Sequence, residues 1–203
     1  MSKVNKREFR NKRPTRSKNI KPERNYRKYK TQLRKDFNSK CGYCDDHDEF
    51  CGGERGFHID HFAPKSKFPE LTNDYQNLVY SCPYCNGKKL NTWVGKNHSP
   101  SHNGTEGFVD PTKSQYDQQF CRDAQGRIIG QTPLGKYMVQ NLNLDLMRHA
   151  YIWQIAELNR KCDEVNGLMM IPNSSSSMRK ELLERYVQIS KRIEGYRKRI
   201  NES

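Results

Sequence analysis

Two Cys-x-x-Cys pairs, Cys41–Cys44 and Cys82–Cys85, constrain the fold of this 203-residue chain more than any other feature of its sequence. No run of apolar residues is longer than four, which excludes a signal-peptide apolar segment and a transmembrane helix. We therefore expect a cytoplasmic protein without membrane contact, in which paired cysteines indicate zinc and not disulfides. One structural Zn²⁺ held by Cys41, Cys44, Cys82 and Cys85 is predicted, with no coordination position left for a substrate.

The composition indicates that this metal is part of folding. Apolar residues make up 33% of the chain, which is low for a globular protein of this size. A thin core needs another source of stability, and a bound metal is a common one in small modules.

The positive charge is concentrated at the N-terminus. The net charge is +14, and residues 1–40 hold 16 Lys and Arg against 3 Asp and Glu, whereas residues 41–203 hold 21 against 20. Such a block favours a polyanion as partner, and nucleic acid is the usual one. Residues 1–24 have almost no apolar residues, so they are predicted to be a disordered basic arm that tethers the protein to the phosphate backbone. A solubilising tail, or docking on an acidic protein, is the alternative.

Hydrophobic spacing predicts an α+β fold with three regions: the arm (1–24), a compact domain (25–110), and a hairpin followed by helices (111–203). Apolar residues at helical spacing predict a helix over 26–37. We expect a strand over 57–62, a loop over 63–76, a second strand over 78–80 and a helix that begins at Pro83. Residues 45–56 and 91–109 are expected to be loops. A small hairpin is expected over 119–130. Two apolar stripes, over 144–165 and 182–200, predict a C-terminal antiparallel helical hairpin.

Three polar residues of the compact domain fit the chemistry of phosphodiester hydrolysis. Asp60 offers a hard oxygen that suits Mg²⁺, and His61 has an ordinary pKa that suits a general base. Asn86 lies one residue after a zinc-binding cysteine, so the zinc site can bring its side-chain oxygen to the ion that Asp60 holds.

The segment from His58 to Lys89 resembles the HNH nuclease motif in its HNN form, flanked by the paired CxxC knuckles that many members carry. The resemblance implies a ββα-metal core, in which Asp60 and Asn86 bind a catalytic Mg²⁺ or Mn²⁺ ion and His61 is the base. It implies that Asn77 orients the base through the loop backbone. Asn86 stands where the family name has His, which leaves the identity of the metal open.

Four lysines are expected to contact phosphate. Lys88 and Lys89 match the family's basic position after the helical Asn, and Lys65 and Lys67 follow the catalytic strand. His58 shares a strand face with Asp60, so it is either a further metal ligand or a surface histidine. His149 is expected to be a bystander, and no partner is apparent for Cys51.

Further elements, among them Asp110-Pro111 and Asn141-Leu-Asn-Leu144, extend the likeness to the HNH component of bacterial antiphage systems of the Septu and retron-associated kind. That component works beside an ATPase, so the resemblance implies an ATPase partner subunit and a role in antiphage defence. Double-stranded DNA is the expected substrate. An RNA-cleaving nuclease and a zinc-stabilised nucleic-acid-binding module without cleavage are the alternatives.

Overall fold

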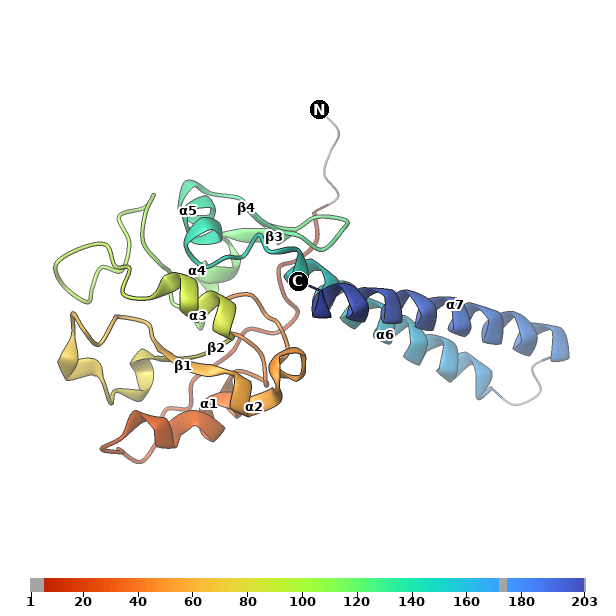
Figure 1. The fold of residues 1–203 in the computed structure, drawn as a ribbon, viewed down its shortest axis with the longest axis horizontal. Coiled ribbons are helices and arrows are strands. Elements are labelled where there is room, and N and C mark those ends of the chain that lie inside the picture. Colours follow the sequence, from red (N-terminus) through yellow and green to blue (C-terminus); the bar gives the residue numbers. More distant parts are fainter. Residues whose placement is uncertain (1–5, 172–174, 203) are drawn as a thin grey trace. The chain divides into compact units, whose positions relative to one another are not determined.

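The computed structural model describes residues 6–171 and 175–202, which divide into two compact units, Met1–His149 and Ala150–Ser203 (Figure 1). The elements of the first unit are η1 (Tyr26–Tyr29), α1 (Lys30–Asp36), η2 (Asp48–Cys51), α2 (Gly53–Gly56), β1 (His58–His61), η3 (Pro69–Leu71), η4 (Tyr75–Asn77), β2 (Leu78–Ser81), α3 (Pro83–Lys89), α4 (Ser114–Asp117), β3 (Phe120–Arg122), β4 (Ile128–Gly130) and α5 (Pro133–Asn141), where η marks a 3₁₀ helix. The α-helix α6 (Met147–Met169) begins in this unit, and α7 (Ser176–Asn201) follows it.

Strands β1 and β2 and helix α3 form the predicted strand, loop, strand and helix. The two strands are antiparallel, with Asp60 opposite Val79 and His61 opposite Leu78. Pro83 begins α3, where its missing N–H costs no helical hydrogen bond, and the Cys82 sulfur caps the same turn by accepting from the Cys85 N–H. The mixed fold with two small sheets confirms the predicted α+β class.

A helical segment precedes this motif, as predicted, and it supplies much of the core. Leu33 and Phe37 are almost fully buried, and Tyr29 packs edge-to-face on Tyr75 with ring centroids 5.0 Å apart. The predicted loop over 45–56 differs, because it contains the short helices η2 and α2. The side chain of His47 caps η2, and Gly52 ends it at a φ of 77°, which favours glycine.

The predicted hairpin, β3 and β4, belongs to the first unit, so the boundary between the units lies after His149 and not after residue 110. Arg122 explains this arrangement. Its buried guanidinium donates to the carbonyl oxygens of Phe9, Gly126 and Cys44 at 2.8–2.9 Å. One side chain thus connects the N-terminal segment, the hairpin and the first cysteine pair.

Residues 6–24 are not a disordered arm. Phe9 is buried against Tyr116 and Phe120, and the backbone of Arg7 exchanges two hydrogen bonds with the backbone of Arg122. The charge count did not reveal this packing, because it treats every arginine as solvated. Residues 1–5 of the predicted arm lie outside the described residues.

Two arginines of this segment are buried and bind other parts of the unit. Arg10 donates to the carbonyl oxygens of Gly42 (3.1 Å) and Pro111 (2.6 Å) and pairs with Asp117 (2.6 Å). Arg16 donates to the Leu78 carbonyl oxygen (2.7 Å) and pairs with Asp110 (2.7 Å). The planar fork of donors on a guanidinium suits such multiple contacts.

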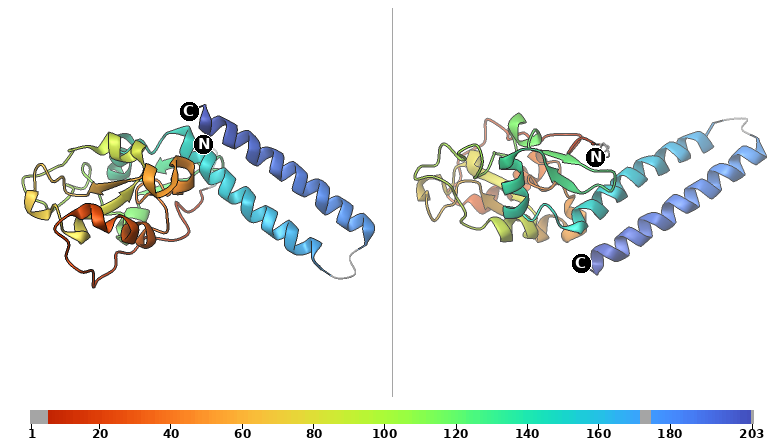
Figure 2. Two further views of the ribbon diagram at one scale, coloured as in Figure 1. Left: turned by 60° about the horizontal axis from the view of Figure 1, so that its bottom comes forward. Right: turned by 90° about the horizontal axis from the view of Figure 1, so that it is seen from above.

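The second unit is a helical hairpin, in which the remainder of α6 lies beside α7 (Figure 2). The Tyr151 and Tyr196 rings lie 5.6 Å apart. The apolar stripes of the two helices are buried, at Ile152, Ile155, Leu158, Cys162 and Val165 and at Leu182, Ile189, Ile193 and Ile200. This packing agrees with the predicted antiparallel pair.

No helix among residues 6–171 and 175–202 is long and apolar enough to span a membrane.

Arg16→Ala should destabilise the protein. The change removes the partner of the Asp110 carboxylate and a donor to the Leu78 carbonyl, both in a buried setting. We expect the free energy of unfolding of the zinc-loaded protein to fall by about 3 kcal/mol, measured by urea denaturation. Arg13→Ala is the matched control at an exposed position and should change it by less than about 0.5 kcal/mol. Equal stability of the two variants would contradict the packed segment.

Candidate active site and zinc site

The sulfur atoms of Cys41, Cys44, Cys82 and Cys85 converge in one buried cluster. Their sulfurs all lie within 4.8 Å of one another, and the Cys44 and Cys82 sulfurs are 3.8 Å apart. Sulfurs bound about 2.3 Å from one tetrahedral zinc ion would be about 3.8 Å from each other. The donor set and its spacing therefore fit a single Zn²⁺.

The backbone between the two pairs explains this convergence. The Gly42 N–H donates to the Tyr80 carbonyl oxygen (2.8 Å), which joins the first knuckle to β2 just before Cys82. A Cβ at position 42 would lie 2.7 Å from the Phe37 ring and 2.8 Å from Val79, so a side chain there would push the knuckle away from β2.

A cleft of about 310 Å³ opens over β1, the middle of α3 and the residues that follow α3. Its lining includes Asp60, His61 and Asn86. The three residues that the sequence assigned to chemistry therefore border one cleft.

Asp60 is held by two neighbours that bind the same carboxylate oxygen. The Tyr43 hydroxyl donates to Asp60 Oδ2 at 2.5 Å, and Lys89 Nζ lies 3.0 Å from it. Burial and the neighbouring carboxylate raise the pKa of Tyr43 well above its usual range, so the phenol stays protonated and donates. Tyr43 comes from the first knuckle and Lys89 from α3, so the zinc-linked elements set the position of Asp60.

His61 is oriented by the loop between the strands. Its Nε2 lies 2.9 Å from the Thr72 carbonyl oxygen. A carbonyl oxygen only accepts, so Nε2 carries the proton and Nδ1 is the basic nitrogen. Burial lowers the pKa of His61 below its ordinary value, although the bond to Thr72 opposes this shift. The lowered pKa favours the neutral imidazole.

Asn77 closes the same loop. Its side-chain oxygen accepts from the Ala63 N–H (2.8 Å), and its amide group donates to the carbonyl oxygens of Ala63 (3.0 Å) and Leu71 (3.3 Å). Leu71 precedes Thr72, so these contacts fix the backbone that binds His61.

Asn86 and His58 both line the cleft and contact each other, with Asn86 Nδ2 3.3 Å from His58 Nδ1. Asn86 is half-buried on α3, and His58 is exposed on β1. An amide and an imidazole are both possible ligands of a divalent ion.

Comparison with known proteins agrees with this geometry. Residues 41–92 match the HNH endonuclease family. Residues 41–92 are an HNH endonuclease domain. The domain belongs to a class of nucleases, which hydrolyse phosphodiester bonds.

One curated relative is the Septu protein PtuB of Bacillus thuringiensis, which is 42% identical to this chain over 53 residues. That match covers 26% of the chain and spans 20% of the length of the relative. No solved structure matches the chain.

The lysines of the HNH domain differ in their surroundings. Lys89 is fully buried, with its Nζ bound to Asp60 and to the His61 carbonyl oxygen (2.9 Å). This contradicts the prediction that Lys89 contacts phosphate, since the amine is internal. Lys65 is exposed at the cleft and Lys88 is exposed on α3, while Lys67 lies 3.5 Å from the Trp93 carbonyl oxygen.

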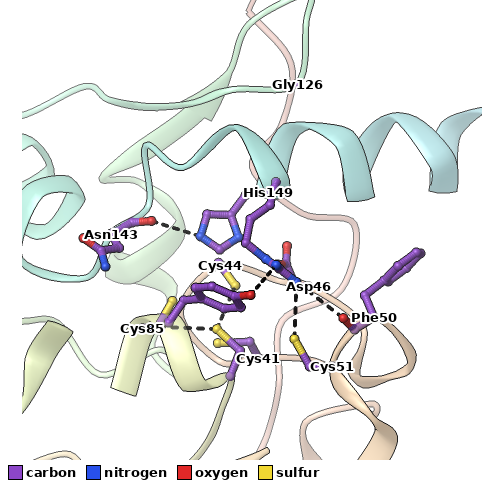
Figure 3. A network of polar contacts seen from close by, with 12 residues as sticks. Cys41, Cys44, Asp46, Phe50, Cys51, Cys85, Gly126, Asn143 and His149 are labelled. Carbon is purple, nitrogen blue, oxygen red and sulfur yellow. Dashed lines mark hydrogen bonds and ion pairs between the residues drawn. The ribbon is translucent and has the colours of Figure 1, made fainter. Parts of the chain in front are cut away.

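A polar network beyond the HNH domain reaches the zinc cluster (Figure 3). His149 is buried, with Nδ1 2.7 Å from Asp46 Oδ2 and Nε2 2.9 Å from the Asn143 carbonyl oxygen. A ring nitrogen of His149, the Asp46 carboxylate and the Cys44 sulfur lie within 4.8 Å of one another. His149 is therefore not a bystander, although it lies far from the knuckle in sequence. Both of its ring nitrogens have other partners, so His149 lies next to the four-sulfur cluster without belonging to it.

Arg148 provides a second contact to this region. Its guanidinium lies 3.9 Å from the centroid of the Tyr84 ring, bonds the Tyr84 hydroxyl (2.6 Å) and donates to the Cys51 sulfur (3.3 Å). Burial raises the pKa of the Cys51 thiol to about 11, so it is neutral. Tyr84 lies between Cys82 and Cys85, and the start of α6 is thus attached to the second knuckle.

The sequence did not indicate that Tyr26 lines the cleft, or that Tyr43 binds Asp60 and Thr72 binds His61. Tyr26 and Tyr29 have the same helical spacing, and only the structure separates the one at the cleft from the one in the core. Thr72 contributes its backbone carbonyl, and the type of side chain at a position does not reveal such a role.

Cys82→Ser should lose zinc and unfold the HNH domain, since no thiolate can be spared from a four-ligand site. We expect about one zinc ion per chain in the wild type and little in the variant, measured by elemental analysis, with loss of cooperative thermal unfolding. Cys51→Ser is the matched control, because Cys51 lies outside the four-sulfur cluster, and it should retain the metal. A zinc-free wild type, or a Cys82→Ser protein that melts normally, would refute the site.

Proposed function

We propose that this protein is a metal-dependent endonuclease that hydrolyses phosphodiester bonds of DNA, with His61 as general base. The observation that carries the proposal is that His61, whose Nε2 lies at hydrogen-bond distance from the Thr72 carbonyl oxygen, borders one cleft with Asp60 and Asn86. A binding module without cleavage has no need for this combination.

His61 supplies the base. Its Nδ1 accepts a proton from a water molecule as the water oxygen forms a bond to phosphorus and the bond from phosphorus to the leaving oxygen breaks. Asn77 supports this step by holding the loop that orients the imidazole. A lowered pKa keeps the base unprotonated at neutral pH.

Asp60 and Asn86 are the proposed ligands of the catalytic divalent ion. Tyr43 and Lys89 both bind Oδ2 of Asp60, so Oδ1 is the oxygen proposed for the ion. Carboxylate and amide oxygens suit Mg²⁺ or Mn²⁺. When bound, such an ion stabilises the negative charge that develops on the phosphate and the leaving oxygen. Lys89 offsets part of the Asp60 charge and keeps the carboxylate in place.

DNA and antiphage defence are proposed from likeness. The relative is a Septu protein, and the resemblance to the HNH component of Septu and retron-associated systems implies a role in defence beside an ATPase subunit. The basic character of residues 1–40 supports a nucleic-acid substrate. Exposed Lys65, Lys67 and Lys88 are proposed to contact phosphate.

His61→Ala should abolish cleavage and leave folding intact. Loss of a general base costs about 10²–10⁴-fold in rate. The measurement is the rate at which zinc-loaded protein converts supercoiled plasmid to nicked or linear DNA in the presence of Mg²⁺ or Mn²⁺. An RNA of matched sequence is tested as a second substrate. His102→Ala is the control, an exposed histidine that does not line the cleft, and should cleave normally. Wild-type cleavage by His61→Ala would assign the base elsewhere, and preferred cleavage of RNA would replace DNA as the substrate.

Asp60→Ala and Asn86→Ala should be inactive for a different reason. Each removes a proposed ligand, so Mn²⁺ affinity should fall about tenfold or more, measured by calorimetry on zinc-loaded protein. Raised Mn²⁺ should restore part of the activity of these variants but none to His61→Ala. Unchanged Mn²⁺ affinity in both variants would refute the ligand assignment.

A further inference from the structure

Tyr26 lines the catalytic cleft although it lies outside the HNH domain. Its backbone is fixed on two sides. The Tyr26 N–H donates to the Asn73 side-chain oxygen (2.9 Å), and the Asn25 side chain caps η1 by accepting from the Arg27 N–H (3.1 Å). Tyr26 is therefore attached to the same loop that orients His61.

Two groups of the cleft contact the Tyr26 side chain. The His61 ring meets it nearly edge-on, with centroids 4.6 Å apart and planes at 71°. Lys65 Nζ lies 3.4 Å from the Tyr26 hydroxyl oxygen and 5.0 Å from the ring centroid. The ring thus lies beside the proposed base, and the hydroxyl lies beside a cation at the cleft.

The surroundings of the hydroxyl are electropositive. Within the described residues, neither Lys65 nor Arg27 has a carboxylate at ion-pair distance, and both are exposed. Partial burial raises the pKa of Tyr26, but hydrogen bonds from Lys65 and Arg27 outweigh it, and the pKa lies below the ordinary value. A field that favours a phenolate also favours a phosphate oxygen at the same place.

The hydroxyl can bind such an oxygen directly. It accepts a hydrogen bond from Lys65 and still has its own proton to donate. We propose that Tyr26 and Lys65 form a subsite for the nucleic-acid phosphate next to the scissile one, and that the Tyr26 ring positions His61. This inference deepens the proposed function and rests on it for the identity of the scissile phosphate.

Binding of a short DNA duplex tests the subsite separately from cleavage. The measurement is fluorescence anisotropy in the His61→Ala background without added divalent ion. Tyr26→Phe keeps the ring and removes the hydroxyl, and it should weaken binding about tenfold, the usual effect of one hydrogen bond to a charged group. Lys65→Met should weaken binding similarly and reduce the slope of log affinity against log salt by about 0.9.

Two further proteins sharpen this comparison. The loss of binding free energy in the double variant Tyr26→Phe/Lys65→Met should be smaller than the sum of the losses in the two single variants, because both groups contact one phosphate. Lys96→Met removes the same charge from an exposed lysine outside the cleft and should bind as the parent does. The subsite would be overturned if Tyr26→Phe bound DNA as tightly as the parent, or if Lys96→Met weakened binding as much as Lys65→Met. This binding test does not depend on whether the protein cleaves DNA.

A substrate with a single phosphodiester separates the two roles of Tyr26. Bis(p-nitrophenyl) phosphate has no neighbouring phosphate, so Tyr26→Phe and Lys65→Met should lose much more kcat/KM on DNA than on this substrate, both measured in Mn²⁺. Tyr26→Ala also removes the ring beside His61, and its kcat should fall on both substrates. Equal losses for Tyr26→Phe on both substrates would instead assign the hydroxyl to the reaction centre and overturn the proposal, as would a wild-type kcat for Tyr26→Ala.

Discussion

The cluster of four cysteine sulfurs is the interaction on which the first unit depends. It joins the knuckle after α1 to the turn before α3, and groups carried by the knuckle and by α3 hold Asp60. Tyr43 lies between Cys41 and Cys44, Lys89 follows Cys85 by one turn of α3, and both bind Asp60. The carbonyl of Cys44 also binds Arg122, which in turn binds Phe9. Contacts therefore link the four-cysteine cluster to the cleft, the hairpin and the N-terminal segment.

The cleft combines charges of opposite sign at short range. Lys89 is internal and compensates the Asp60 carboxylate, which would otherwise be a costly buried charge. Lys65 faces outward without a carboxylate partner among the described residues, so its charge is available to a ligand. Two lysines of one domain thus have different surroundings, one internal beside a carboxylate and one exposed at the cleft.

The parts of the fold that depend on short-range patterns could be predicted from the sequence. The cysteine spacing, the strand–loop–strand–helix order and the group Asp60, His61 and Asn86 are of this kind. Lys88 and Lys89 show why the rest could not be. They look equivalent in the sequence, but neighbours on a helix point about 100° apart, so one is solvated and the other internal. The roles of Arg16 and His149 depend on contacts with distant residues, which charge counts and motif spacing do not contain.

The long-range contacts of the N-terminal arginines have a consequence for the order of synthesis. Arg10 binds Pro111 and Asp117, and Arg16 binds Asp110, so both bind residues that are made much later. A ribosome that adds about 5–20 residues per second needs between about 5 and 20 s to proceed from the first of these partners to the last. During that interval the nascent segment has none of its native contacts with these residues. The N-terminal segment of the first unit can therefore complete its native contacts only after Asp117 has been made, although its contacts with Gly42 and Leu78 can form earlier.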